Sequence, residues 1–292
     1  MKGIIKNKVA YLVFLLPALV FYLFAVFYPI IDSIRLSFVS WQGIGPQNYV
    51  GFSNYLRLFK DPVMWESFFN NLIYVVIVVA MQLLIGLLFA VLLTYMQKNV
   101  TIVKTLYYIP CIITTVAVGQ MFRSMYATQP EGLFNIMLSA IGLGDLVRSW
   151  LADVDTVLVA VSLPEGWRFT GMYMVIYYAA LISIDSEVSE AAIIDGASKW
   201  TTLWKIKIPM IKPVIILTLT MCITGALRGF DIPYLLTNGG PGNASELMST
   251  YMYKQAFSSL QFGYGSAIAV FIIVESIIAV FVLKIFERRS AK

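Results

Sequence analysis

The sequence predicts an all-α membrane protein with six transmembrane helices, and two features of its composition support this prediction. Of the 292 residues, 59% are hydrophobic and only 13% are charged, whereas a soluble domain usually has about 45–50% apolar and roughly 25% charged residues. The apolar residues also gather in runs of about 20 or more, the length an α-helix needs to cross a bilayer. A soluble protein of this composition would lack the polar residues needed to cover its surface.

Six long apolar runs are each expected to form one span. They cover about residues 9–31, 69–96, 102–122, 156–184, 209–230 and 264–286. Pro110 is expected to kink the third span, and the fourth is expected to be interrupted at its centre around Pro164. The first run follows Lys2, Lys6 and Lys8 and is longer than the roughly 7–15 apolar residues of a secretory signal. It is therefore interpreted as a retained span.

The distribution of Lys and Arg predicts that both termini lie in the cytoplasm, because basic residues near membrane ends favour that side. With the N-terminus inside, 13 of the 21 basic residues are cytoplasmic and six are exterior, while Arg168 and Arg228 lie at membrane depth. Residues 1–8 then form a cytoplasmic N-terminus, 185–208 a cytoplasmic loop and 287–292 a cytoplasmic tail. The exterior loops are about 32–68, 123–155 and 231–263.

Several function classes are disfavoured by what the sequence lacks. It has no His, which is the commonest general base, and Cys111 and Cys222 lie in apolar runs where a thiol behaves as a small hydrophobe. No metal or cofactor is therefore expected. The net charge of +5 does not indicate nucleic acid, because the basic residues flank apolar segments and form no patch on a soluble module. No Gly-Lys dipeptide occurs, so a Walker A phosphate loop is absent.

The loop 185–208 is the most informative segment of the chain. Ser186 or Ser189 is expected to cap a short helix, and Gly196 is a natural place for that helix to end. A second helical piece would follow over 197–206, with one face formed by Trp200, Leu203 and Trp204. Pro209 would then suit the first turn of the next span. An ordinary amphipathic loop packed on the membrane interface is the alternative.

The same loop contains Glu190-Ala191-Ala192, three further residues, Gly196, nine further residues, and then Ile206-Lys207-Ile208-Pro209. This pattern resembles the EAA signature of ABC importer permeases, with Ile208 where the family has Leu. Three later strings resemble the carbohydrate-uptake branch of that family, which includes the maltose, multiple-sugar and glycerol-phosphate systems. These strings are 236–241 (LTNGGP), 251–257 (YMYKQAF) and 262–265 (FGYG).

The resemblance implies that the loop is a coupling helix that docks into a cleft on a separate ATPase subunit. The residues at this contact would be Glu190, Ala191, Ala192, Asp195 and Gly196. It also implies a non-catalytic permease of a bacterial-type inner membrane, which moves a carbohydrate or sugar-like solute by alternating access. The partners it implies are a second homologous permease, two copies of the ATPase, an extracytoplasmic solute-binding protein, the lipid bilayer and the carbohydrate-like substrate.

Ionisable residues at membrane depth are costly and usually face a cavity or a partner, so they are candidates for the solute path. Trp167 could stack on a sugar and Arg168 could donate hydrogen bonds, while the resemblance to maltose-type permeases adds positions in the fourth and fifth spans. The candidates are Trp167, Arg168, Phe169, Met172, Arg228, Asp231 and Glu275. Three structural alternatives remain open: a helix end at Pro164, an Arg228–Asp231 ion pair, and a protonated Glu275 hydrogen-bonded between helices.

Two other function classes are also considered. A stand-alone ion-coupled carrier would place several acidic residues at the centre of the membrane, where only Glu275 is found. A membrane-embedded enzyme would need a converging catalytic set, and the acidic residues are mostly in loops. The sequence therefore favours the importer permease.

Overall fold

The computed structural model of the chain describes residues 8–290, and the side chains of residues 13–285. Most of the predicted N-terminal segment 1–8 and the end of the predicted tail 287–292 therefore lie outside the described residues. The chain divides into two compact units. The first comprises residues 1–61 and 252–273, and the second comprises residues 62–251 and 274–292.

The first unit combines helices with a short β-hairpin. Its elements are α1 (Lys8–Tyr22), the π-helical turn η2 (Leu23–Phe27), α2 (Tyr28–Leu36), β1 (Val39–Ser40), β2 (Asn48–Tyr49), α3 (Ser53–Lys60), η6 (Lys254–Ser258) and the first part of α16 (Phe262–Ser290). The strands pair antiparallel, with Val39 opposite Tyr49. The Asn54 amide donates to the carbonyl of Val39 at 3.0 Å, and Tyr264 donates to Asp61 at 2.6 Å. The first bond ties α3 to the hairpin, and the second ties α16 to the end of α3.

The second unit is almost entirely helical. Its elements are α4 (Pro62–Val79), η3 (Ala80–Ile85), α5 (Gly86–Tyr95), α6 (Val100–Ile112), α7 (Thr115–Met125), α8 (Leu133–Ala140), η4 (Gly144–Leu146), α9 (Val157–Ile182), α10 (Ser186–Ile194), α11 (Lys199–Thr202), η5 (Leu203–Lys207), α12 (Ile208–Met210), α13 (Lys212–Leu227), α14 (Asp231–Thr237), most of α15 (Met248–Tyr253) and the end of α16.

Helix α9 is the centre of the second unit, where it packs against α4, η3, α5, α6, α7, α13 and α14. Glycines allow this close packing. A methyl group at Gly171 would overlap the carbonyl oxygen of Tyr107 in α6, and one at Gly166 would lie 2.7 Å from the sulfur of Met81. One buried cluster joins α5, α9 and α13 around Met174, and another joins α7, α9 and α14 around Val161.

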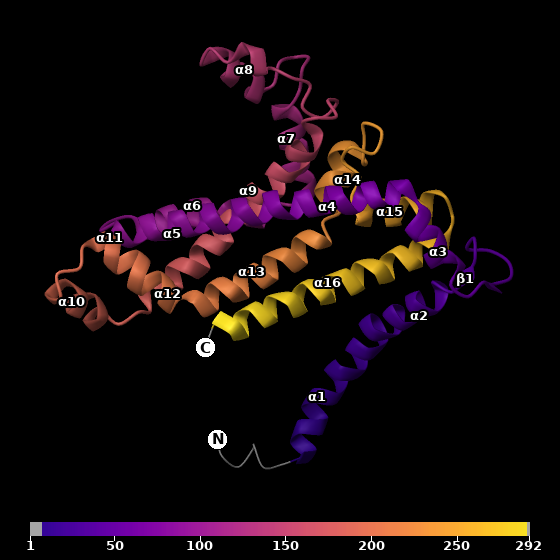
Figure 1. Ribbon diagram of the computed structural model, residues 1–292, viewed down its shortest axis with the longest axis horizontal. Coiled ribbons are helices and arrows are strands. Elements are labelled where there is room, and N and C mark those ends of the chain that lie inside the picture. The colour runs from indigo at the N-terminus through magenta and orange to yellow at the C-terminus, as the bar shows by residue number, and fades with distance from the viewer. Residues whose placement is uncertain (1–7, 291–292) are drawn as a thin grey trace. The chain divides into compact units, whose positions relative to one another are not determined.

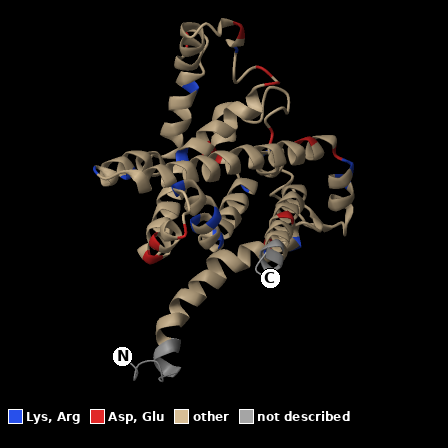
Figure 2. Ribbon diagram, turned by 60° about the vertical axis from the view of Figure 1, so that its left-hand side comes forward, with Lys and Arg blue, Asp and Glu red and all other residues tan. Residues whose placement is uncertain are grey.

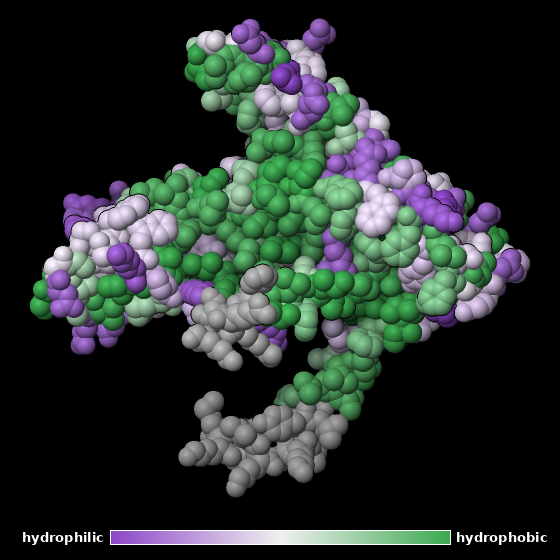
Figure 3. Space-filling view, in the orientation of Figure 1, coloured by the Kyte–Doolittle hydropathy of each residue, from purple (hydrophilic) through white to green (hydrophobic). Residues whose placement is uncertain are grey.

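Four helical stretches are long and apolar enough to cross a membrane: Val13–Leu36, Pro62–Tyr95, Lys212–Thr237 and Phe262–Ile285. Two bent helix pairs, α6 with α7 and α9 with α10, would bring the number to six if each pair is one span. Each predicted span overlaps one of these segments, which confirms a multi-span helical protein with four to six candidate spans in the described part. Charged residues lie mostly at helix ends and in connections (Figure 2), and Figure 3 shows apolar residues over the long helices of the second unit.

The third predicted span is not one kinked helix. Helix α6 continues through Pro110 to Ile112, and α7 begins at Thr115 after a bend of 96°, which Figure 1 shows as α7 leaving the direction of α6. The bend follows the proline by three residues because Ile113 and Thr114 are extended, and Thr114 caps α7 by accepting from the Ala117 N–H. At 13 residues, α6 is about 20 Å long, shorter than the roughly 30 Å apolar core of a bilayer.

The predicted interruption of the fourth span is wrong, because α9 runs unbroken from Val157 to Ile182 with Pro164 inside it. A proline lacks the N–H that would bond to the carbonyl four residues earlier, here Ala160. The hydroxyl of Tyr126, at the end of α7, donates to that carbonyl at 3.0 Å. Both residues are buried, so a side chain 34 positions away replaces the missing helical bond.

Candidate coupling loop and solute path

The loop that follows α9 begins with a capped helix. The side chain of Asp185 accepts a hydrogen bond from the Glu187 N–H at 3.1 Å and caps α10. A side-chain acceptor at this position satisfies one of the free N–H groups of a helix N-terminus. The expected caps, Ser186 and Ser189, instead lie inside the helix. The capping residue is thus Asp185, and the prediction of a short capped helix is otherwise correct.

The same helix ends at Ile194, and the chain turns at Gly196, as predicted. Gly196 has a φ of +82°, and the Ala197 N–H donates to the Ala192 carbonyl at 2.9 Å while the Gly196 N–H donates to the Ile193 carbonyl at 3.0 Å. This pair of bonds is a Schellman motif, in which glycine adopts the left-handed conformation without steric cost. A side chain at Gly196 would meet no atom within 4 Å, so backbone strain would be its main local effect.

The second half of the loop differs in two respects from the prediction. Ser198 caps α11, and the tryptophans Trp200 and Trp204 contact each other at 5.4 Å between ring centroids. Leu203 is buried whereas both tryptophans are exposed, so the three side chains do not share one face. The fifth helix begins at Lys212 and not at Pro209, which lies in the short α12.

The five predicted coupling residues do not all face outward. Glu190, Ala191, Asp195 and Gly196 are exposed, whereas Ala192 is buried. Beside them, Ile193 and Ile194 are 62% and 84% exposed, and neither is among the predicted coupling residues. The role of the five motif residues in coupling stays a prediction.

Arg168 is held at the bend between α6 and α7. Its guanidinium donates to the hydroxyl of Thr115, the first residue of α7, at 2.7 Å and lies 4.9 Å from the centre of the Phe169 ring. The Nε atom of Arg168 is buried and has no hydrogen-bond partner among the described residues. A buried donor without a partner is costly, so this atom is available to a bound group.

Glu165 was overlooked as a candidate, although it lies one helical turn before Arg168. The charges of both Arg168 and Asp231 act on its carboxylate, so Glu165 is within electrostatic range of both groups. Gln82 of η3 is also close, since its amide donates to the Glu165 carbonyl at 2.9 Å and accepts from the Cys222 thiol at 2.9 Å. A lone Gln in an apolar span was the sequence signal for this contact.

The other path candidates have mixed surroundings. Trp167 lies edge-on to Phe122 at 5.7 Å and is 37% exposed, whereas Phe169 and Met172 pack against the apolar cluster of α5, α9 and α13. Arg228 donates to the Thr224 carbonyl at 3.0 Å and forms no ion pair with Asp231 among the described residues, so that structural alternative is wrong.

Glu275 of α16 is not brought to this group by any hydrogen bond or ion pair within residues 13–285. Both of its carboxylate oxygens are buried without a hydrogen-bond partner in that part of the chain. The proposed hydrogen bond between helices is therefore not formed here. Its place in a solute path stays a prediction.

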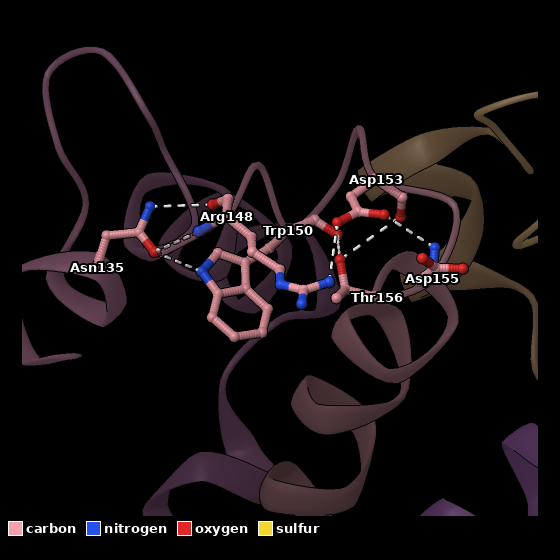
Figure 4. Close-up of polar contacts among 6 residues, drawn as sticks. All are labelled: Asn135, Arg148, Trp150, Asp153, Asp155 and Thr156. Carbon is pink, nitrogen blue, oxygen red and sulfur yellow. Dashed lines mark hydrogen bonds and ion pairs between the residues drawn. The ribbon is translucent and has the colours of Figure 1, made fainter. Parts of the chain in front are cut away.

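The connection between α7 and α9 has an internal polar network, shown in Figure 4. The buried side chain of Asn135 accepts from the Trp150 indole N–H at 2.7 Å and donates to the Arg148 carbonyl at 3.0 Å. Arg148 also pairs with Asp153 at 3.4 Å, and Thr156 donates to the Trp150 carbonyl at 3.2 Å. This predicted exterior loop is consequently a folded element that leads directly into α9.

Residues 64–292 match the family described as the inner membrane component of binding-protein-dependent transport systems. The chain belongs to this family. It is 37% identical to the probable ABC transporter permease protein YurN of Bacillus subtilis, over 92% of each chain. It is 32% identical to the lactose transport system permease protein LacF of Rhizobium radiobacter, over 96% of this chain and 94% of that one.

The fold also matches a solved structure. A bacterial ABC transporter involved in the import of the polysaccharide alginate superimposes with a TM-score of 0.85 and 24% identity, over 100% of this chain and 99% of that one. The chain is thus a multi-span, inner-membrane permease subunit of an ABC importer and performs no catalysis itself. Family membership favours this function over a stand-alone carrier or a membrane enzyme.

Proposed function

We propose that the permease moves a carbohydrate-like solute by alternating access, with six spans, both termini in the cytoplasm and the loop 185–208 as its contact with a separate ATPase. A second homologous permease would complete the pore. Two ATPase copies would bind on the cytoplasmic side, and a solute-binding protein would deliver solute outside. The segments would be those predicted, with boundaries adjusted to the helices observed.

The geometry of the coupling loop is the observation that supports this proposal most directly. Helix α10 is capped at one end by Asp185 and closed at the other by the Schellman motif at Gly196. Its defined shape leaves Glu190, Ala191 and Asp195 exposed. A short rigid helix with small and acidic residues on its surface suits a cleft on a partner, because little conformational freedom is lost on docking.

The solute class rests on the name of one relative and on the residues around Arg168. The relative LacF is named for lactose transport. Its name supports a sugar-like solute for the present chain. Arg168 has an unpartnered donor, and Glu165 and Asp231 are acceptors within electrostatic range of each other. Such a mixed set of donors and acceptors, with Trp167 half-exposed beside it, suits hydroxyl groups on a ring with an apolar face. These residues are proposed to line the path.

The test is ATP-dependent uptake of radiolabelled lactose and other sugars in vesicles that contain the whole assembly. Gly196→Trp and Glu190→Lys are expected to abolish uptake and to release the ATPase during purification. Gly142→Trp is a matched control, because Gly142 has a φ of +80° with no atom within 4 Å of a built Cβ, and the same strain occurs there in the exterior loop. A non-glycine residue in this conformation costs about 1–2 kcal/mol.

The control separates docking from folding. Both glycine variants should reach the membrane in similar amounts, while only Gly196→Trp should lose the ATPase. Equal uptake and equal ATPase retention by the native chain and both loop variants would contradict the assignment of the coupling site. Loss of uptake and of the bound ATPase in Gly142→Trp would show that backbone strain alone explains their loss in Gly196→Trp.

A further inference from the structure

Helix α8 presents an apolar face that the rest of the second unit does not cover. Leu133, Ile136 and Met137 are 49%, 48% and 58% exposed. Their spacing of three and four residues places them on one side of the helix. Further exposed apolar side chains follow the helix: Ile141, Leu143 and Leu146. The helix itself contains no charged residue.

The opposite face of α8 packs on the protein. Phe134 stacks on Tyr126 at 5.1 Å between ring centroids, and the buried side chain of Asn135 accepts from the Trp150 indole, as Figure 4 shows. Apart from Asn135 and Ser139, every residue of the helix is apolar. A helix that is apolar on all sides is typical of a protein interior or of a membrane, so the outward face of α8 needs an apolar partner.

The bend before α7 places α8 at the depth of the bilayer. Helix α6 has 13 residues and is about 20 Å long, so it crosses about two thirds of the roughly 30 Å apolar core. Helix α7 then turns by 96° and runs nearly parallel to the membrane plane, away from the long helices and toward α8 (Figure 1). Helix α8 therefore stays near the level at which α6 ends, in the outer half of the bilayer.

The apolar surface of α8 is continuous with a surface that already has an apolar partner. Figure 3 shows apolar residues from the long helices of the second unit over α7 to α8. Because the chain is a multi-span inner-membrane protein, lipid is the partner of much of that surface. The charged residues of the connection between α7 and α9 lie outside α8, at Glu131, Asp145, Arg148, Asp153 and Asp155. The polar part of the connection can thus face water while α8 faces lipid.

We propose that the outward face of α8 lies in the outer leaflet, against the acyl chains of phospholipids. The choice of leaflet rests on the proposed function, which places residues 123–155 on the exterior side. Helices in membranes associate through small residues and interhelical hydrogen bonds, and Leu133, Ile136 and Met137 offer neither, which favours lipid over a second permease. A soluble binding protein is disfavoured, because the face would be left in water whenever that protein dissociates.

This contact has a consequence for α9. The Trp150 indole donates to Asn135 of α8, and the Trp150 carbonyl accepts from Thr156 at the start of α9, so α8 is joined to the first turn of α9. The acyl chains of a leaflet are fluid and form no fixed contact. Helix α8 would therefore move with α9 during alternating access, whereas a rigid contact with another protein would oppose that movement.

The test is photocrosslinking of the whole importer in sealed, right-side-out vesicles of phosphatidylethanolamine and phosphatidylglycerol. The variants are Ile136→benzoylphenylalanine and Met137→benzoylphenylalanine. Before illumination, the impermeant reagent trinitrobenzenesulfonate tags the amines of the outer leaflet. Trypsin then releases residues 124–148, which contain no lysine, so a tag on this peptide belongs to a crosslinked lipid. We expect its mass to rise by one tagged phosphatidylethanolamine in both variants.

The matched control is Val154→benzoylphenylalanine. Val154 is 62% exposed in the same connection, but it lies between Asp153 and Asp155, and its tryptic peptide 149–168 also lacks lysine. We expect no lipid on that peptide. The proposal would be overturned by crosslinks from positions 136 and 137 to a second permease or to the binding protein, by the absence of any adduct, or by equal lipid adducts at all three positions.

The remaining outcomes separate this contact from the proposed function. An adduct with untagged phosphatidylethanolamine would place α8 in the inner leaflet and would contradict both the proposal and the topology. ATP-dependent uptake by the native chain is measured in vesicles of the same composition. Uptake without a lipid adduct at position 136 or 137 would disprove the α8 contact and leave the transport function intact. A tagged adduct without uptake would support the α8 contact and contradict the transport function.

Discussion

The hydrogen bond from Tyr126 to Ala160 should be essential to the continuity of α9. Tyr126→Phe removes one oxygen atom and creates no cavity, because the rest of the ring keeps its contacts with Phe122 and Phe134. It leaves the carbonyl of Ala160, freed by Pro164, buried without a partner. A buried polar group without a hydrogen bond costs about 1–3 kcal/mol. The unfolding free energy should fall by that amount.

A second substitution tests the cause and not only the size of this effect. Pro164→Ala restores an N–H at position 164, which can donate to the Ala160 carbonyl as in any helix. In the Pro164→Ala background, Tyr126→Phe should therefore cost less than about 0.5 kcal/mol. The difference between the two costs is the coupling energy of the double-mutant cycle.

The assay is unfolding of the purified permease in mixed micelles with increasing SDS, followed by the circular dichroism of the helices. All four proteins of the cycle are compared at one detergent concentration. A cost of Tyr126→Phe below about 0.3 kcal/mol in the native background, or an equal cost in both backgrounds, would refute the reasoning. In either case the helix would be continuous for a reason other than the tyrosine hydroxyl.

Three further predictions follow from single contacts. Gly171→Ala should destabilise the permease by more than about 3 kcal/mol, since its methyl group would overlap the Tyr107 carbonyl. Gly225→Ala has open space around it and should be neutral or stabilising by up to about 1 kcal/mol. Thermal unfolding measures the change in stability of both variants. Asp185→Ala should remove about 1 kcal/mol of capping and reduce ATPase retention, whereas Ser186→Ala should leave both unchanged. Asn135→Leu should speed proteolysis between α7 and α9 about tenfold, because buried hydrogen bonds to Trp150 and Arg148 are lost, while exposed Asp145→Asn should have no effect on the cleavage rate.

The multi-span helical class could be predicted because the bilayer imposes a length and a composition on any helix that crosses it. The turn at Gly196 was equally predictable, since few residues other than glycine adopt the conformation that closes a Schellman motif. Both are local properties. They can be recognised in a stretch of residues without knowing what lies beside it in the fold.

Two of the three errors have the opposite origin. Pro164 was interpreted as a break because the partner of the Ala160 carbonyl is on another helix. The bend after Pro110 was misplaced because two extended residues and the Thr114 cap decide its position. Glu165 was overlooked because its importance depends on Arg168 and on Asp231 from a distant segment. Tertiary contacts between segments far apart in the chain decide the continuity at Pro164 and the surroundings of Glu165, whereas Ile113 and the Thr114 cap set the bend locally.

The continuity of α9 changes how the proposed coupling loop would act on the proposed solute path. The helix has 26 residues, which corresponds to about 39 Å, and its last turn leads through Asp185 into α10. A helix broken at Pro164 would let Arg168 follow the loop while the first turns of α9 stayed with α7 and α14. Because the Tyr126 hydroxyl caps the freed carbonyl, α9 is one rigid element, and Val157, Ala160 and Val161 pack on those helices. In the proposed mechanism, a displacement at the loop would therefore move Arg168 together with its Thr115 partner.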